Sequence, residues 1–405
     1  MTSNLDKNQL ALLWLVRKAI TNCVDMVPQA DWEVVEGLAA KHGVLWMLYL
    51  GAKQHSQQIP SDKIRAWRGL FHASVLRNEQ LNDIQTKVVS WLLENGMRAV
   101  VLKGTSCSRY YTIPEARTLG DIDILIDKDN MHVFGNYLLQ QGFHTSTPGH
   151  PFHVEYYGNE TVIEVHHMCT EVPNSDGGRI VAQEMEHFLD DVCMVSMNDM
   201  KFPVLSEMHQ ALMLLLHMER HMMGGGIELR QLCDWAMFVE NSSPSHWEQA
   251  TLKLLRRCGL LKYASVITKA CVDYLGVSAS HAPWCLDIKP DLSDAFILDV
   301  FCGGKMGNHD IDVQDSFFNE RSILGQKKQS RVKAIIAMLN KLTYRHWPVV
   351  QKYKILLPLF WLYIPIRFWV RSQRGLRSKI DIGELWDLST QRKKLLEKLD
   401  LYKVQ

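Results

Sequence analysis

Apolar side chains recur at helical spacing through the first 95 residues of the chain. The first stripe consists of Leu10, Leu13, Val16 and Ile20. These residues follow one another at three- or four-residue steps and so share one helix face. Similar stripes run over 34–48, with one slip, and over 67–93, where Asn95-Gly96 stands at the position of a helix C-cap. This part of the chain is predicted to be helical.

The pattern changes at Arg98, where short apolar runs replace the helical stripes. Residues 98–102 read as a short buried strand closed by a glycine, and a helix of about two turns is expected from Thr105. The sequence DIDILID at 121–127 alternates with period two, which is typical of a strand with one polar and one apolar face. A helix over 129–141 follows. Two strands, 152–157 and 161–167, then flank the hairpin dipeptide Gly158-Asn159.

Helical spacing returns after Ser206 and continues over 206–223, 228–239 and 247–275. Residues 310–326 are expected to form a loop, and 331–342 a basic helix. The predicted fold class is α+β, with a small mixed β-sheet and helices on one face, flanked by N- and C-terminal helical regions. The predicted units are a helical region over 1–95, a sheet-containing core over 96–203 and a helical region over 204–405.

Composition places the chain among ordinary globular proteins. Of its 405 residues, 47% are hydrophobic and 22% charged, and the formal net charge is +1, which excludes disordered and fibrous classes. The N-terminus lacks the features of a signal peptide, so a cytoplasmic location is expected. The nine cysteines contain no CxxC pair, and we expect free thiols in a reducing compartment.

Candidate chemistry centres on Asp121 and Asp123. Alternate strand residues face the same side, so these carboxylates would project together, about 7 Å apart along the backbone. Their repulsion would be offset by a hard cation such as Mg²⁺ or Mn²⁺. Two solvated acids on an edge strand are the alternative. Glu164 in a later strand supplies a third carboxylate, with His166 on its own face.

The context of these carboxylates favours the metal hypothesis. Lys103-Gly104-Thr105 places a glycine and a hydroxyl at a predicted helix N-terminus, where free backbone amides favour phosphate. Three carboxylates beside a phosphate site are what a two-metal phosphoryl or nucleotidyl transfer requires.

The stretch VVLKGTSCSRYYTIPEARTLGDIDILID resembles the DNA polymerase beta-like nucleotidyltransferase superfamily. More narrowly, the chain resembles the bacterial uncharacterised nucleotidyltransferase family, over about 95–240. That family has an LKG turn, an arginine before GDIDIL and an acidic-x-His strand. The motifs here are Leu102 to Gly104, Arg117, Gly120 to Leu125, and Glu164 to His166; the family is also similar at His217, His221, Arg230 and Asp234.

The resemblance implies a role for each matched residue. Asp121 and Asp123 would hold both metals, and Glu164 would hold the catalytic one and assist deprotonation of the acceptor. Gly104 and Thr105 would cradle the β- and γ-phosphates near Gly120. Lys103 or Arg117 would either neutralise the triphosphate or form a structural ion pair. Two positions depart from the superfamily pattern: Thr105 replaces the usual serine, and Glu164 stands where aspartate is common.

His166, His217, His221, Arg230 and Asp234 are further candidates for contacts with acceptor or nucleotide. His217 and His221 have the spacing of a metal pair, but HMERH is not the zinc-protease motif. A contact between helices, or a contact with nucleotide or acceptor, is favoured over zinc. The predicted function is transfer of a nucleoside monophosphate from a nucleoside triphosphate, ATP being the first candidate, to an unidentified acceptor hydroxyl with release of pyrophosphate. A regulatory nucleotide-binding protein and an RNA-modifying enzyme are the alternatives.

Charge is distributed unevenly along the chain. Residues 321–380 contain 14 Lys or Arg and no Asp or Glu, which leaves the remainder acidic. We expect this basic segment to fold back on the acidic body and partly rim the nucleotide site. Docking on anionic lipid or nucleic acid is the alternative. The apolar run 355–370 is too short to span a bilayer; a buried helix is favoured over one lying on a membrane surface.

Overall fold

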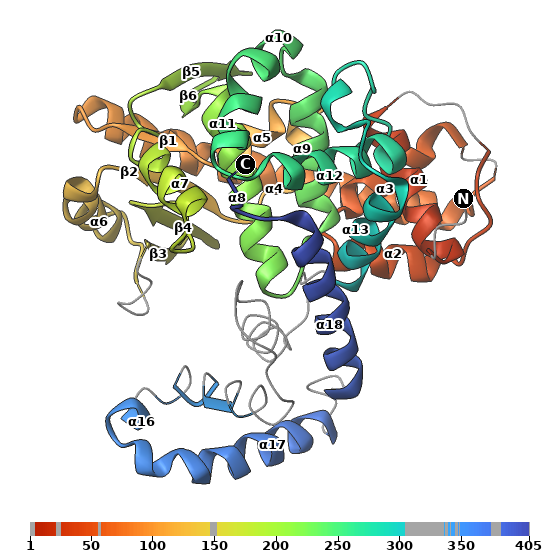
Figure 1. Cartoon of the computed structure of the whole chain (residues 1–405). Helices are drawn as coiled ribbons and strands as arrows, with labels where there is room; N and C mark the ends of the chain where they lie inside the picture. Colours follow the sequence, from red (N-terminus) through yellow and green to blue (C-terminus); the bar gives the residue numbers. More distant parts are fainter. Residues whose placement is uncertain are drawn as a thin grey trace.

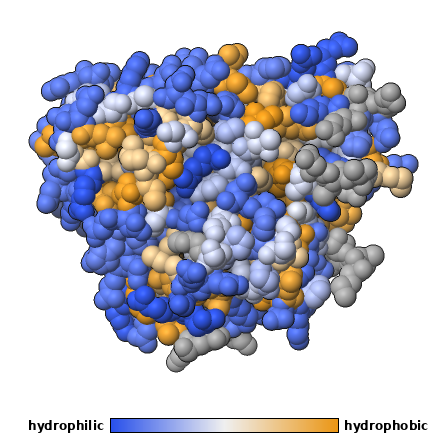
Figure 2. All heavy atoms as spheres, turned by 90° about the horizontal axis from the view of Figure 1, so that it is seen from above, coloured by the Kyte–Doolittle hydropathy of each residue, from blue (hydrophilic) through white to orange (hydrophobic). Residues whose placement is uncertain are grey.

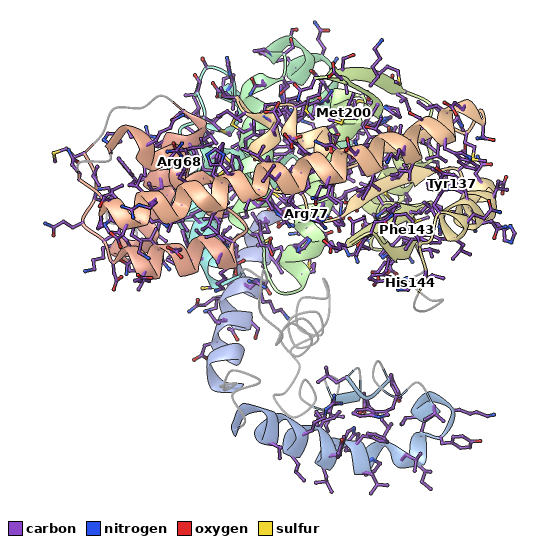
Figure 3. The ribbon with its side chains drawn as sticks, turned by 180° about the vertical axis from the view of Figure 1, so that it is seen from behind. Arg68, Arg77, Tyr137, Phe143, His144 and Met200 are labelled. Carbon is purple, nitrogen blue, oxygen red and sulfur yellow. The ribbon has the colours of Figure 1, made fainter. Side chains whose placement is uncertain are left out.

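The computed structural model describes residues 5–21, 26–55, 58–145, 152–303, 336, 339–340, 342–344, 347, 349–373 and 382–404. Four helices open the chain, as predicted: α1 (Lys7–Ile20), α2 (Trp32–Lys41), α3 (Leu45–Ala52) and α4 (Ser61–Glu94). Gly96 follows α4 with a φ of +68°, a left-handed conformation that ends the helix. Figure 3 shows α4 from behind, running from the N-terminal helices to the strands.

A mixed four-stranded sheet follows α4. Its strands are β1 (Ala99–Val101), β2 (Ile122–Ile126), β3 (His153–Gly158) and β4 (Thr161–His166), in the order β1-β2-β4-β3. The β2 and β4 strands are parallel, and the other two pairs are antiparallel. Two helices connect the strands: α5 (Thr105–Ser108), which is a single turn and shorter than predicted, and α6 (Met131–Gln140). The predicted α+β class is confirmed.

The structure corrects the predicted turn of one hairpin and contains a second hairpin that was not predicted from sequence. Gly158 pairs with Thr161, so the β3–β4 turn consists of Asn159 and Glu160, with φ of 49° and 56°, and not of Gly158-Asn159. The missed hairpin is β5 (Val192–Met197) with β6 (Met200–Leu205), which follows α7 (Asp176–Glu186). Because Pro203 lies inside β6, the segment does not read as a strand.

The sheet separates two hydrophobic cores. Ile122, Ile124 and Ile126 project from β2 into a core that includes Val88 of α4 and Phe134 of α6. The opposite face carries Asp123 and Leu125, and Leu125 joins the larger helical core. The period-two pattern of β2 is therefore as predicted, but every residue of the strand is buried, including Asp123. The alternative of solvated acids on an edge strand is wrong, because β2 lies between β1 and β4.

The C-terminal half is helical. Its helices are α8 (Glu207–Met223), α9 (Leu229–Asn241), α10 (Pro244–His246), α11 (Leu252–Arg257), α12 (Leu261–Ala270), α13 (Pro290–Cys302), α16 (Val349–Lys352), α17 (Leu357–Gln373) and α18 (Ile382–Leu399). Side chains from α1, α3, α8, α9, α12, α13 and α18 share the larger core, so segments from both ends of the chain pack together (Figure 1).

The basic segment departs from expectation where the structure describes it. Figure 1 shows α16 and α17 set apart from the body of the molecule, so the expectation that 321–380 folds back is wrong for these two helices. The expected loop at 310–326 and most of the basic helix at 331–342 lie outside the described residues. Among described residues, no helix is long and apolar enough to cross a membrane, and the eight described cysteines are free.

Candidate active site

Three carboxylates meet where β2 runs beside β4. Asp121 directly precedes β2, and Asp123 is its second residue. The parallel register pairs Asp123 with Glu164, which brings residues 41 positions apart in sequence to adjacent sites on one face of the sheet. Oxygen atoms of Asp121, Asp123 and Glu164 all lie within 4.8 Å of one another. The sequence-predicted carboxylate triad is therefore assembled in the structure.

A lysine and a histidine lie among these carboxylates. Lys103, which follows β1, places its Nζ 2.7 Å from Oδ1 of Asp123. His166 places its Nε2 3.1 Å from the same oxygen and 3.3 Å from Oε2 of Glu164. Asp123 is 2% exposed, and a buried carboxylate of this kind needs such partners to stay ionised. Lys103 thus neutralises part of the negative charge of the triad, and His166 adds to this when it is protonated.

The proximity of the charges shifts the protonation of each group. The charge of Asp123, together with burial, raises the pKa of Asp121 to about 6. Burial acts to raise the pKa of Asp123, but Lys103 and His166 outweigh it and hold that pKa below its usual range. Burial acts to lower the pKa of His166, yet its hydrogen bonds to Asp123 and Glu164 raise it above the ordinary value. Asp121 is therefore the carboxylate that charge crowding destabilises most.

The donor set fits a hard divalent cation. All three ligands are carboxylates, and oxygen ligands in this number suit Mg²⁺ or Mn²⁺ better than softer metals. Three carboxylates crowd together with only Lys103 and His166 in contact with them among described residues, and the charge of Asp123 together with burial raises the pKa of Asp121. A bound divalent cation would offset this crowded negative charge, so the residues present fit the metal that the sequence motif implies.

A second cluster of possible metal ligands shares Glu164 with the triad. His153 of β3 is the direct cross-strand neighbour of His166, and ligand atoms of His153, Glu164 and His166 also lie within 4.8 Å of one another. Sequence reasoning included His166 but missed His153. The antiparallel register of β3 and β4 is what brings the two imidazoles together, and their ring centroids lie 4.9 Å apart.

The turn that the sequence offers for phosphate binding has a glycine in the left-handed conformation, but the Thr105 hydroxyl already has a partner within the protein. Gly104 has a φ of +60°, a conformation that favours glycine, and it directly precedes α5. Thr105 is buried, and its Oγ1 donates to Oδ1 of Asn82 on α4 at 3.1 Å. The backbone of this turn remains a candidate for phosphate contacts, whereas the Thr105 hydroxyl helps to hold α5 against α4.

Arg117 forms a structural ion pair, which was one of the two roles considered for it beside neutralisation of the triphosphate. Its guanidinium forms a bidentate ion pair with Asp234 of α9, and the Nε–Oδ1 distance is 3.0 Å. Both side chains are buried, and Tyr111 donates from its hydroxyl to the same carboxylate at 2.9 Å. Because the guanidinium donates to Asp234 through two of its nitrogens, this ion pair holds the loop before β2 against the helical region.

Asn78 also holds this loop, and sequence reasoning missed it. Its buried side-chain amide donates to the carbonyls of Glu115 and Arg117 at 2.7 Å and accepts from the backbone N–H of Leu119 at 2.9 Å. The only available sign in the sequence was a polar residue within the apolar pattern of α4. Asn78 therefore positions the segment that leads into Asp121.

The helical region contributes further predicted residues near the triad. The Nη1 atom of Arg230 lies 3.7 Å from where a Cβ on Gly120 would stand, next to Asp121. Gln231 donates to the Nε2 of His217 at 3.1 Å, and burial lowers the pKa of His217 far below its ordinary value. The His217 and His221 rings lie 4.6 Å apart, and among described residues neither belongs to a group of three metal ligands. The predicted helix contact fits this arrangement.

Comparison with known proteins places the chain in a family. Residues 28–276 match the family model described as "Uncharacterised nucleotidyltransferase", and because this match spans more than half of the chain, the protein belongs to that family. Among solved structures, the chain is similar to an antigenic nucleotidyltransferase-like protein from Paracoccidioides brasiliensis, at 15% identity and a TM-score of 0.33. That similarity covers 50% of this chain and 96% of the other. No curated protein matches the chain.

Proposed function

We propose that this protein is a nucleotidyltransferase that uses Mg²⁺ or Mn²⁺ to move a nucleoside monophosphate from a nucleoside triphosphate to an acceptor hydroxyl, releasing pyrophosphate. The observation that carries the proposal is the triad of Asp121, Asp123 and Glu164, whose oxygens lie within 4.8 Å of one another. Membership of a nucleotidyltransferase family supports it independently. ATP is the first triphosphate to test.

Each residue of the triad has a separate task in this proposal. Asp121 and Asp123 would hold both metals, and Glu164 would hold the catalytic one and accept the proton of the acceptor hydroxyl. The bound metals would stabilise the negative charge on the attacking and leaving oxygens. The Nε2 atom of His166 contacts both Asp123 and Glu164, so His166 would fix the relative positions of these two carboxylates.

Cationic side chains would receive the triphosphate. The ammonium of Lys103 faces Asp123, and it would turn to the phosphates when a metal takes its place beside the carboxylates. Arg230 lies beside Gly120 and is partly exposed; its Nη2 donates to Glu228 at 3.4 Å, and its Nη1 faces Gly120, from where it would reach phosphate oxygens. The backbone amides of Gly104 and Thr105 would complete the phosphate contacts.

The first prediction separates an enzyme from a binding protein. Pyrophosphate release and transfer of label from α-³²P-labelled triphosphates would be measured with fractionated small-molecule and macromolecular acceptors. Asp123→Asn should lower the rate by about a thousandfold or more, because it removes a charge shared by both metals. The exposed acid Asp129, changed to Asn, is the matched control and should leave the rate unchanged.

Calorimetry with a non-hydrolysable triphosphate provides the accompanying binding measurement. Binding should tighten when Mg²⁺ is added and weaken in excess chelator, since the metal bridges carboxylates and phosphates. Tight metal-dependent binding without transfer to any acceptor fraction would contradict the enzyme and favour a regulatory nucleotide-binding protein. Binding that is equally tight in chelator would contradict the metal site itself.

A further inference from the structure

An exposed apolar stripe runs along α17 and the turn before it. Ile355 is 87% exposed, Leu359 63%, Leu362 69% and Ile366 60%. Successive members are four, three and four residues apart, so they lie on one face of a helix. We call these four residues the α17 stripe. It lies outside residues 28–276, the part of the chain that the family model matches.

The opposite side of α17 is already packed. Ile364 is 4% exposed, and the ring of Phe360 lies 4.7 Å from that of Trp347. The Nε1 atom of Trp361 donates to Oδ1 of Asn340 at 2.8 Å. These contacts fix the rotation of the helix, so the α17 stripe faces outward. Tyr363 beside it is also 48% exposed, whereas Phe360 and Trp361 are half-buried and Ile364 is buried. The expectation that 355–370 forms a buried helix is therefore wrong for the stripe.

Four large aliphatic side chains in one outward row are unusual on a protein surface. Singly exposed apolar residues are common, but contiguous ones mark an interaction site. The face seen from above in Figure 2 is mainly hydrophilic with separate apolar patches. The stripe, in contrast, lies on an element that Figure 1 shows standing away from the body.

The charge around the stripe distinguishes between the partners that could cover it. The segment 321–380 carries 14 Lys or Arg and no acid, and within it Lys352 and Lys354 are exposed beside the start of the stripe. A symmetric dimer formed through α17 would bring two such basic segments together, which repulsion opposes. Single-stranded nucleic acid is bound mainly through aromatic stacking. Tyr353 and Tyr363 are 51% and 48% exposed near the stripe, but the four residues of the stripe itself are aliphatic. Aliphatic residues next to uncompensated positive charge match an anionic bilayer surface.

We propose that α17 docks on an anionic lipid membrane, with the α17 stripe inserted at the boundary between headgroups and acyl chains and the nearby lysines at the lipid phosphates. The helix would lie in the membrane plane. Its 17 residues span about 26 Å, less than the roughly 30 Å hydrocarbon core. This surface is distinct from the carboxylate site and does not depend on the proposed transferase activity.

Vesicle sedimentation with the full chain tests the proposal. The protein should bind vesicles of phosphatidylcholine containing about 30% phosphatidylglycerol and bind pure phosphatidylcholine at least about tenfold more weakly. Leu359→Ser/Leu362→Ser/Ile366→Ser should weaken binding to anionic vesicles by about a hundredfold, because three apolar side chains leave the bilayer. Lys352→Gln/Lys354→Gln should weaken it by about tenfold and reduce its salt dependence.

Matched variants exclude a general effect of surface hydrophobicity. Leu76, Val133 and Leu139 on α4 and α6 are 62%, 50% and 46% exposed, and Leu76→Ser/Val133→Ser/Leu139→Ser should bind vesicles like the wild type. Circular dichroism and thermal denaturation check that each variant is folded. Equal binding by the stripe variant and the wild type would overturn the proposal. So would a lack of vesicle binding, a dimer that the stripe variant abolishes, or oligonucleotide binding that depends on the stripe.

Discussion

At the scale of single residues, the properties of the candidate site follow from several ionisable side chains that lie in close contact. Oδ1 of Asp123 accepts from both Lys103 and His166, and this keeps a buried carboxylate ionised without a metal. Lys103 and Arg230 act to lower the pKa of Asp121, but the charge of Asp123 and burial outweigh them and raise that pKa to about 6. The same crowding that would favour metal binding therefore destabilises the metal-free protein near neutral pH.

Asp121→Asn should for that reason stabilise the metal-free protein. When folding raises the pKa of an acid, the folded protein loses stability as the pH increases from the unfolded-state pKa to the folded-state pKa of that acid. For Asp121 this range runs from about 4 to about 6. The variant should gain about 1–2 kcal/mol over wild type above pH 6, allowing for the partial exposure of Asp121, and nothing below about pH 4. Denaturant unfolding in excess chelator at several pH values measures this. A gain that does not change with pH would contradict the charge explanation.

At the scale of elements, the β3–β4 hairpin determines where Glu164 and His166 stand. Its two turn residues, Asn159 and Glu160, both have positive φ, the conformation of a type I′ turn. Asn accepts this conformation readily, but Glu does not. The carbonyl of Glu160 also accepts from Arg77 of α4, a residue labelled in Figure 3, which ties the turn to the long helix.

Glu160→Gly should stabilise the protein by about 1 kcal/mol, because glycine adopts the left-handed conformation without the cost that Cβ imposes. Glu160→Ala is the matched control, since it removes the same carboxylate but keeps Cβ. Thermal and denaturant unfolding of both variants provide the measurement. If both variants gained equally, the charge of Glu160 and not its backbone conformation would be responsible.

At the scale of the whole molecule, the last helix, α18, packs into the same hydrophobic core as the first helices. Leu395, Leu396 and Leu399 of α18 are buried in the cluster that also contains residues of α1 and α3. Arg392 of α18 is 1% exposed; its Nε donates to Asp299 of α13 at 2.9 Å and its Nη1 to the carbonyl of Gly224 at 2.8 Å. Residues beyond the family match at 276 thus contribute to the stability of the common core.

Arg392→Met should lower the free energy of unfolding by about 3–5 kcal/mol, because it leaves the largely buried Asp299 without its cation. Lys262 forms an ion pair with Asp400 at 2.6 Å, but both side chains are considerably more exposed. Lys262→Met is the matched control and should cost less than about 1 kcal/mol. Equal losses in the two variants, measured by denaturant unfolding, would contradict a special role of Arg392 in holding α18.

Much of the fold and of the site was accessible from sequence because it depends on neighbours along the chain. The period-two pattern of 121–127 predicted the β2 strand and placed Asp121 and Asp123 together. The Asn95-Gly96 pair predicted the end of α4, and the alternation through Glu164 predicted a third carboxylate with His166 on the same face. Each of these follows from backbone periodicity or local conformational preference, which a few consecutive residues determine.

Tertiary structure alone decided which distant groups meet. The pairing of Arg117 with Asp234, the approach of His153 to His166, and the position of Lys103 on Asp123 depend on strand register and helix packing. The β5–β6 hairpin and the outward face of α17 likewise depend on what does or does not pack against them. An apolar run records that a side chain avoids water, but only the folded chain determines whether its own core or another surface covers that side chain.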